Sequence, residues 1–184
     1  SCGGYRDEER IKNNVAPEHT LYSDSNRMRA CAPIARYKSP TNITPLKYKV
    51  DAEYKDRSNN SSLNLNFGNN DDSFTYTFYR DENVYIKEGF VDRNNSQSIK
   101  LKNIIIEEVP INEVFTENSL LNINILGQGK AVFMMDGKVV EGIWQKDSRT
   151  ARTKYFDKSG KEVEFNRGKT WINFVAKGSN YEAK

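Results

Sequence analysis

The sequence has few of the residues on which most metal sites and hydrolytic active sites depend. Its 184 residues include one histidine, His19, and two cysteines, Cys2 and Cys31. A structural zinc site needs four nitrogen or sulfur ligands, so these residues cannot supply one. A catalytic triad would have to use His19, which no motif places beside a nucleophile and which lies in a segment broken by Pro17. We therefore expect no metal, no cofactor and no histidine-based catalysis.

A strong excess of one charge and long apolar runs are also missing. The 28 Lys and Arg residues nearly balance the 25 Asp and Glu residues, which leaves a formal net charge of +3. Nucleic-acid-binding domains usually carry a marked basic stripe, so we expect no nucleic-acid partner. No apolar run approaches the roughly 20 residues that a membrane-spanning helix requires. A chain of this length, 36% hydrophobic, can form a stable core without disulfides or metal ions.

The residues from 127 to 175 predict a series of antiparallel strands. The apolar run 131–135 is too short for a helix and suits a buried strand. Asp136-Gly137 follows, the dipeptide that most readily forms a two-residue hairpin turn. Later turns at 158–160 and 167–168 separate further strands, which we predict at 138–146, 154–157, 162–165 and 170–175.

The earlier residues predict one helix and then more strands. The helix is expected at 23–36, capped by Ser23 or Ser25. A hairpin is expected around Asp81-Glu82, and Gly127-x-Gly129 is interpreted as a turn because no helix follows it. The strands are predicted at 47–50, 63–67, 74–79, 84–87, 99–109 and 120–126. The fold class is therefore α+β, mostly an antiparallel β meander with hairpins and one main helix near the N-terminus.

Several motifs in the C-terminal half resemble the C-terminal domain of the YerB-like bacterial lipoproteins. They are D-G-K at 136–138, V-x-E-G-x-W at 139–144, K-D-S-R-T-x-R-T at 146–153, D-x-x-G-K-E at 157–162 and G-K-T-W-I at 168–172. Those proteins are extracytoplasmic proteins of Gram-positive bacteria without a settled reaction. The resemblance implies a cellular location and a fold, and it supplies no catalytic residue.

The resemblance also suggests how the chain is divided. Arg6, Asp7 and Arg10, followed by residues 16–22, are similar to a junction that in longer relatives follows a separate N-terminal domain. Nothing similar to that domain precedes it here, which fits either a fragment or a short member of the family. We divide the chain into a junction segment at 1–22, a single α+β domain at 23–176, and a tail at 177–184.

The N-terminal residues Ser1-Cys2-Gly3-Gly4 resemble the start of a mature bacterial lipoprotein, in which the cysteine carries the lipid. This interpretation predicts a protein at the cell surface, lipid-anchored to the outer face of the cytoplasmic membrane through Cys2. Two alternatives are a cloning remnant with a stray thiol and a disulfide between Cys2 and Cys31, which an oxidising compartment permits.

One polar stretch is a candidate ligand-binding site. Its residues are Lys146, Arg149, Arg152 and Lys154, with Trp144 beside them. Guanidinium groups can hold phosphate or carboxylate while an aromatic ring stacks on a sugar. The competing interpretation is that Trp144 lies in the core, Asp147 pairs with one arginine, and the rest is a solvated connection.

Two functions of different classes fit these observations. The first is a non-catalytic module that binds an envelope polymer or a partner protein, and the sequence favours it because no active site is visible. The second is a cell-envelope hydrolase whose catalytic groups the sequence does not reveal. Glu107-Glu108 come closest to a paired-carboxylate site, but on a strand they face opposite ways.

Overall fold

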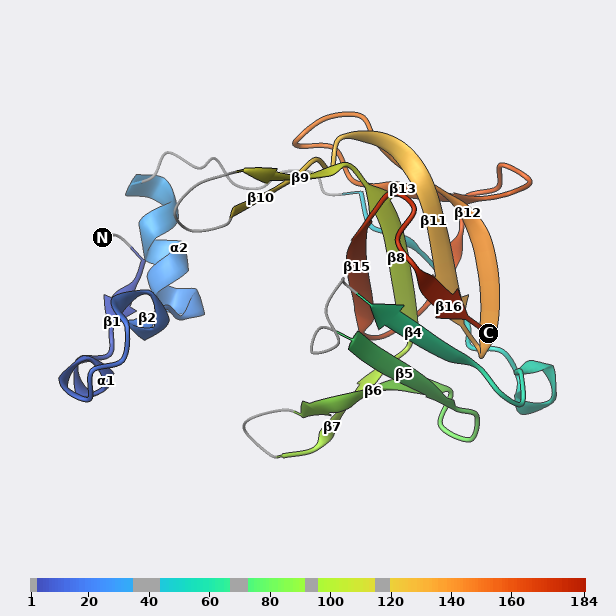
Figure 1. The fold of residues 1–184 in the computed structure, drawn as a ribbon, viewed down its shortest axis with the longest axis horizontal. Helices are drawn as coiled ribbons and strands as arrows, with labels where there is room; N and C mark the ends of the chain where they lie inside the picture. Colours follow the sequence, from blue (N-terminus) through green and yellow to red (C-terminus); the bar gives the residue numbers. More distant parts are fainter. Residues whose placement is uncertain (1–2, 35–43, 67–72, 92–95, 115–119) are drawn as a thin grey trace. The chain divides into compact units, whose positions relative to one another are not determined.

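Strands dominate the structure, a computed structural model that describes residues 3–34, 44–66, 73–91, 96–114 and 120–184. Strands hold 51% of the chain and helices 14%, which confirms the predicted fold class. The chain forms two units, residues 1–43 and residues 44–184, which are described separately (Figure 1). The helix predicted at 23–36, which we placed in one domain with the strands, lies in the first unit.

The first unit contains two helices and a small antiparallel ribbon. Its elements are β1 (Tyr5–Arg6), α1 (Glu8–Lys12), η1 (Pro17–Thr20), β2 (Leu21–Tyr22) and α2 (Ser25–Ile34). α2 confirms the predicted main helix, of which the last two predicted residues, 35 and 36, lie outside the described residues. Its cap is Asp24 rather than Ser23 or Ser25, since the Asp24 carboxylate accepts the backbone N–H of Asn26 and of Arg27, both at 2.9 Å.

The second unit is built from two five-stranded sheets and two smaller strand pairs. The central sheet has the order β13-β12-β11-β8-β15, and the outer sheet has the order β16-β4-β5-β6-β7. β9 pairs with β10 and β3 pairs with β14. The bounds are β3 (Lys47–Lys49), η2 (Tyr54–Asp56), β4 (Ser62–Asn66), β5 (Ser73–Tyr79), β6 (Val84–Val91), β7 (Ser98–Leu101), β8 (Asn103–Val109), β9 (Ile111–Val114), β10 (Leu120–Ile123), β11 (Gly127–Met135), β12 (Lys138–Lys146), β13 (Lys154–Asp157), β14 (Glu164–Asn166), β15 (Thr170–Ala176) and β16 (Tyr181–Ala183).

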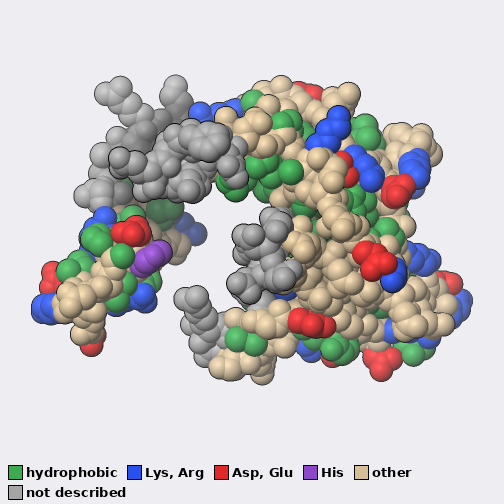
Figure 2. Space-filling view, viewed as in Figure 1, with side chains coloured by type: hydrophobic (Ala, Val, Ile, Leu, Met, Phe, Trp, Pro, Cys, Tyr) green, Lys and Arg blue, Asp and Glu red, His purple; other side chains and the backbone are tan. Residues whose placement is uncertain are grey.

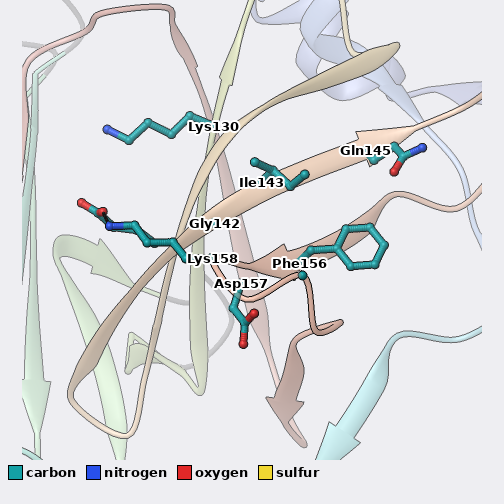
Figure 3. Close-up of a pocket in the computed structure, with 9 residues that line it drawn as sticks. Lys130, Gly142, Ile143, Gln145, Phe156, Asp157 and Lys158 are labelled. Atoms are coloured by element: carbon teal, nitrogen blue, oxygen red, sulfur yellow. Dashed lines mark ion pairs between the residues drawn. The ribbon is translucent and has the colours of Figure 1, made fainter.

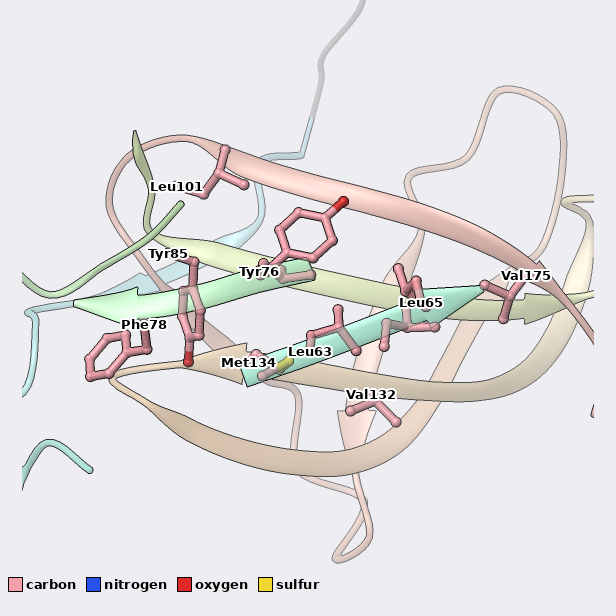
Figure 4. Close-up of a cluster of buried hydrophobic side chains, with 11 residues drawn as sticks. Leu63, Leu65, Tyr76, Phe78, Tyr85, Leu101, Val132, Met134 and Val175 are labelled. Carbon is pink, nitrogen blue, oxygen red and sulfur yellow. The ribbon is translucent and has the colours of Figure 1, made fainter. Parts of the chain in front are cut away.

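The middle strands of the central sheet are buried on both faces. Val132 and Met134 of β11 face the outer sheet, where they pack with side chains such as Leu63 and Tyr76 in the inter-sheet core (Figure 4). Phe133 of β11 faces the other way and belongs to a second core with Trp144, Tyr155 and Phe165. A strand covered on both sides needs apolar residues at every position, which explains the continuous apolar run of β11.

Both predicted hairpins are confirmed. β11 and β12 pair up to Met135 and Lys138, and the two residues between them, Asp136 and Gly137, have φ angles of 54° and 69°. These positive angles fit the right-handed twist of the strands that the turn joins. The second hairpin joins β5 to β6 through residues 80–83.

Several segments differ from the sequence-based expectation, and the strand predicted at 120–126 ends at Ile123. The strand predicted at 99–109 is two strands, because the chain passes from β7 in the outer sheet to β8 in the central sheet. Gly127-x-Gly129 is the start of β11 rather than a turn. A Cβ on Gly129 would lie 2.6 Å from Trp144 Nε1, so glycine is needed there for the close approach of the indole. Residues 181–183, placed in the predicted tail, form β16 and pair with β4.

Candidate functional site

The predicted cation stretch is the connection between two neighbouring strands of the central sheet. Lys146 ends β12 and Lys154 begins β13. Lys146 Nζ donates a hydrogen bond to the backbone carbonyl of Ala151 inside this connection. Lys154 Nζ lies 3.5 Å from a carboxylate oxygen of Asp147. Both lysines therefore help to hold the connection in place.

The two arginines of the stretch have different surroundings. Arg152 donates from Nη2 to Glu162 Oε1 at 2.6 Å, and its side chain is only 18% exposed. Lys47 lies 2.9 Å from the other oxygen of the same carboxylate. Hydrogen bonds from Arg152 and Lys47 hold the pKa of Glu162 below its usual range. Arg149 is exposed, and its side chain makes no ion pair or hydrogen bond with the part of the chain that the structure describes.

Trp144 is a core residue. It is 1% exposed, and its indole Nε1 donates to the backbone carbonyl of Glu108 at 2.9 Å. The structure does not bring its ring to the surface beside the cations, so no face is left for a ligand to stack on. Of the five predicted site residues, Arg149 and Lys154 are the exposed ones. The role of the four cations in binding stays a prediction.

The opposite face of the same two strands carries a groove. Ile143 and Phe156 lie directly opposite each other in the β12–β13 ladder, on the face away from Trp144 and Tyr155. Ile143 is 43% exposed although it lies near the middle of a nine-residue strand. The groove has a volume of about 630 Å³ and is lined by Lys130, Glu141, Gly142, Ile143, Gln145, Phe156, Asp157, Lys158 and Gly160 (Figure 3). We call it the β12–β13 groove.

Gly142 allows the two strands of the groove to approach closely. A Cβ at this position would lie 1.9 Å from the backbone oxygen of Phe156 and 2.9 Å from the Phe133 ring. Neither the strand backbone nor the buried ring can move away cheaply. Glycine at position 142 is therefore a requirement of the strand pairing next to the groove.

The rim of the groove carries charges that are already paired. Lys158 forms an ion pair with Glu141, and its hydrogen bond lowers the pKa of that carboxyl. Lys130 Nζ lies 3.5 Å from Glu108 Oε1. The Ser159 hydroxyl donates to Asp157 at 2.6 Å and lowers the pKa of its carboxyl. Because the pKa values of Glu141 and Asp157 are lowered, both carboxyl groups favour the charged form and neither is suited to act as a general acid. The groove therefore has an apolar floor and a rim that carries both positive and negative charges.

Positive side chains are interspersed with negative ones elsewhere on the surface too. On the face drawn in Figure 2, Lys and Arg lie among Asp and Glu instead of forming one basic field. This arrangement agrees with the small net charge of +3. It favours a ligand recognised by shape and apolar contact over a highly charged polymer.

Glu107, which we considered as half of a paired-carboxylate site, carries a buried carboxyl group. It is 3% exposed and accepts a hydrogen bond from the Tyr155 hydroxyl at 2.6 Å. Burial in an apolar environment, which its position in the sequence did not indicate, raises the pKa of Glu107. Glu108 accepts instead from the Tyr181 hydroxyl, on the opposite face of the strand. The two carboxyls therefore cannot act as a catalytic pair.

A buried polar network surrounds Asp136, which the sequence indicated only as a turn residue. Its carboxylate accepts hydrogen bonds from Lys49 Nζ at 2.5 Å and from the side-chain amides of Asn83 and Asn166, each at 2.7 Å. Burial alone would raise the pKa of Asp136, but these bonds outweigh burial and lower it. No sequence motif signals this cluster, because its members are far apart along the chain.

Neither metal ligands nor membrane spans stand out. Within the described ranges, no three His, Cys, Asp or Glu side chains are grouped so that they could hold a metal ion. The same part of the chain contains no helix with the length and apolarity that a bilayer crossing demands.

Comparison with known proteins places the chain in a family. A family model described as the C-terminal domain of a protein of unknown function (DUF3048) matches residues 63–172, which is more than half of the chain. The chain belongs to this family. The resemblance inferred from the motifs at 127–175 is thereby confirmed, and the family match begins well before those motifs, at residue 63.

Two comparisons connect this family member to a Bacillus subtilis protein. It is 26% identical over 165 residues to the protein of strain 168 described as "Putative lipoprotein YerB", which covers 86% of this chain and 48% of the relative. It also resembles the crystal structure of Bacillus subtilis YerB, with a TM-score of 0.70, 20% identity, and coverage of 97% of this chain and 59% of that chain. The chain thus spans about half the length of its curated relative. The structural match shows a shared fold.

Proposed function

We propose that the second unit is a non-catalytic binding module of an extracytoplasmic lipoprotein, and that the β12–β13 groove binds an extended segment of a partner protein. The observation that carries this proposal is the groove itself. Ile143 and Phe156 expose an apolar floor on a regular pair of strands, while Lys158 pairs with Glu141 on the rim and Lys130 pairs with Glu108. Such a surface can bury aliphatic side chains without leaving a charge unpaired.

A partner protein fits this surface better than an anionic wall polymer. Binding of a phosphate-rich polymer depends on cations that are free to meet it. Lys130 and Lys158 at the groove, and Lys154 and Arg152 in the connection, already have carboxylate partners. Arg149 alone among the predicted cations offers an unpaired group within the described residues, and one guanidinium is a weak anchor for a polyanion.

The test places an acidic side chain in the floor of the groove. A photocrosslinking residue at position 145 should capture a protein in intact cells, and Ile143→Asp should remove that crosslink. Losing one buried isoleucine costs about 2 kcal/mol, or roughly 30-fold in affinity, before the penalty for burying a charge. Tyr79→Asp is the matched control, because Tyr79 is 48% exposed on the outer sheet.

The outcomes separate the partner classes. Loss of the crosslink with Ile143→Asp but not with Tyr79→Asp supports the groove. If the crosslink survives Ile143→Asp, the groove is not the binding surface. Binding to protein-free wall material that Arg149→Ala and Lys154→Ala abolish would instead support the polymer ligand.

The cellular location is proposed on separate grounds. The relative is described as a lipoprotein, and the Ser1-Cys2-Gly3-Gly4 start suits lipid attachment at Cys2. Stable anchoring needs two acyl chains, which the diacylglyceryl group supplies. The structure gives Cys31 as disulfide-bonded and does not describe Cys2, so fractionation has to decide between a lipid and a disulfide. Cys2→Ala in a full-length precursor should release the protein from membranes, and unchanged fractionation would refute the anchor.

A further inference from the structure

At the other edge of the central sheet, no described strand pairs with the outer side of β15. β15 pairs with β8 in parallel over seven residues, and it is the last strand of the sheet, on the side away from β13 (Figure 1). A strand in this position presents a row of unpaired backbone N–H and C=O groups. The groove lies at the β13 side of the sheet, so β15 is a separate surface.

β15 lacks the features that usually protect an edge strand. Proteins discourage edge pairing with charged residues, proline, bulges or very short strands. The β15 sequence, T-W-I-N-F-V-A, has no charge and no proline, and its pairing with β8 runs without a register shift. Ile172 and Phe174 lie on one face of the strand and are 41% and 37% exposed. An added strand would cover these two side chains as well as the backbone.

Cations flank this uncharged strand at both ends. Arg167 and Lys169 precede it and Lys177 follows it, and all three are exposed. Their side chains make no ion pair or hydrogen bond with the described residues, whereas Lys102 and Lys130 are paired with carboxylates. Cations without a carboxylate partner among the described residues therefore lie at both ends of the β15 edge.

We propose that the free edge of β15 binds an extended peptide segment of a partner protein as an added strand, and that acidic residues at both ends of this segment meet Arg167, Lys169 and Lys177. A seven-residue strand spans roughly 23 Å, so the acidic residues should stand about eight positions apart. Backbone hydrogen bonds supply affinity and the flanking charges set the register.

A second copy of this chain is the less favourable occupant. Antiparallel pairing of two β15 strands about Asn173 would set Lys169 of each copy opposite Lys177 of the other. Like charges directly opposite each other destabilise a strand pair. An acid-flanked segment converts the same two positions into ion pairs.

The test uses the whole chain and a defined peptide. The probe is fluorescein-labelled Asp-Glu-Thr-Val-Thr-Val-Thr-Glu-Asp, followed by anisotropy at low salt, with a Lys-flanked peptide of the same core for comparison. The double variant Lys169→Glu, Lys177→Glu should weaken binding of the acidic probe at least about tenfold and favour the Lys-flanked one. The matched control is Lys138→Glu, Lys161→Glu, two exposed lysines away from β15 whose side chains have no ion pair or hydrogen bond in the described part of the chain.

Hydrogen exchange distinguishes strand addition from general electrostatic attraction. Bound probe should slow exchange of outward amides within residues 170–176 and leave the β13 edge unchanged. The proposal is overturned if the probe does not bind at millimolar concentration, if both charge-reversed variants lose it equally, or if β15 gains no protection. Concentration-dependent dimerisation that protects β15 without peptide would overturn it in favour of a second copy.

Discussion

Asp136→Asn is the substitution that most directly tests how this fold is held together. Asparagine keeps the size of the side chain and suits the turn, because Asn-Gly adopts the positive φ angles as readily as Asp-Gly. The Oδ1 position can still accept from Asn83 and Asn166, which donate to Oδ1 in the structure. The Oδ2 position, which faces Lys49 Nζ at 2.5 Å, would become an amide group pointing its hydrogens at an ammonium group.

The expected loss follows from the burial of the two partners. Removing a hydrogen bond to a charged group costs about 1.5–3 kcal/mol. The Lys49 side chain is 30% exposed and the Asp136 side chain 6%, so water can solvate the freed ammonium and the loss should stay below that of a fully buried pair. We expect about 2–3 kcal/mol in the free energy of unfolding, or roughly 5–10 °C in Tm for a chain of this size.

The pH dependence gives this prediction a second readout. Asp136 has a pKa below its ordinary value of 3.8 in the folded protein, so its contribution is present above that value and is lost as the pH falls through the folded pKa. The stability difference between wild type and Asp136→Asn should therefore be constant at neutral pH and shrink below about pH 4.

Denaturant unfolding monitored by tryptophan fluorescence measures both effects. Asp147→Asn is the control, because Asp147 forms an exposed pair with Lys154 at 3.5 Å and should cost less than about 0.5 kcal/mol. A loss for Asp136→Asn no larger than that of this control would show that the Asp136 network does not stabilise the fold.

Three further changes test other parts of the second unit. Arg152→Ala should lower the free energy of unfolding by about 1–3 kcal/mol because it removes the less exposed of the two cations that pair with Glu162 and leaves only Lys47, whereas Arg149→Ala should be neutral in the same denaturation experiment. Gly142→Ala should destabilise by more than about 2 kcal/mol and disturb the Phe156 ring signals in NMR, and a neutral result would contradict the close strand approach. Because the folded pKa of Glu107 lies above its ordinary value of 4.5, burial of this group penalises the fold as the pH rises. Glu107→Gln should therefore gain stability relative to wild type as the pH rises above about 4.5, and a difference that stays constant with pH would refute it.

Local sequence rules predicted the strands and hairpins because those features depend on neighbouring residues. The apolar run before Asp136-Gly137 and the alternation in 73–79 specify burial and turns within short windows. The break at Lys102 was missed for a related reason. Both halves of 99–109 favour a strand, and only the packing of two sheets decides that they belong to different ones.

Residues that meet across the fold could not be predicted from the sequence. The partners of Asp136 lie at positions 49, 83 and 166, and nothing in their spacing indicates that they converge. The sequence left two interpretations of Trp144 open, a ligand-binding ring beside the cations and a core residue, and the structure shows the core residue. Strand alternation sends it to the core and leaves Ile143 on the surface.

The motifs that identify the family therefore describe how the domain folds more than what it binds. In D-G-K, the aspartate holds the buried network and the glycine completes the turn. In V-x-E-G-x-W, the glycine allows the close approach of the next strand and the tryptophan fills the core. Of its two unspecified positions, Val140 packs against the second core and Ile143 lies on the floor of the groove. Asp136, Gly137, Gly142 and Trp144 face inward or close a turn, and the groove that we propose to bind a partner lies on the face of the sheet away from Trp144. The same logic applies to β15, where buried Asn173 and Val175 alternate with exposed Ile172 and Phe174.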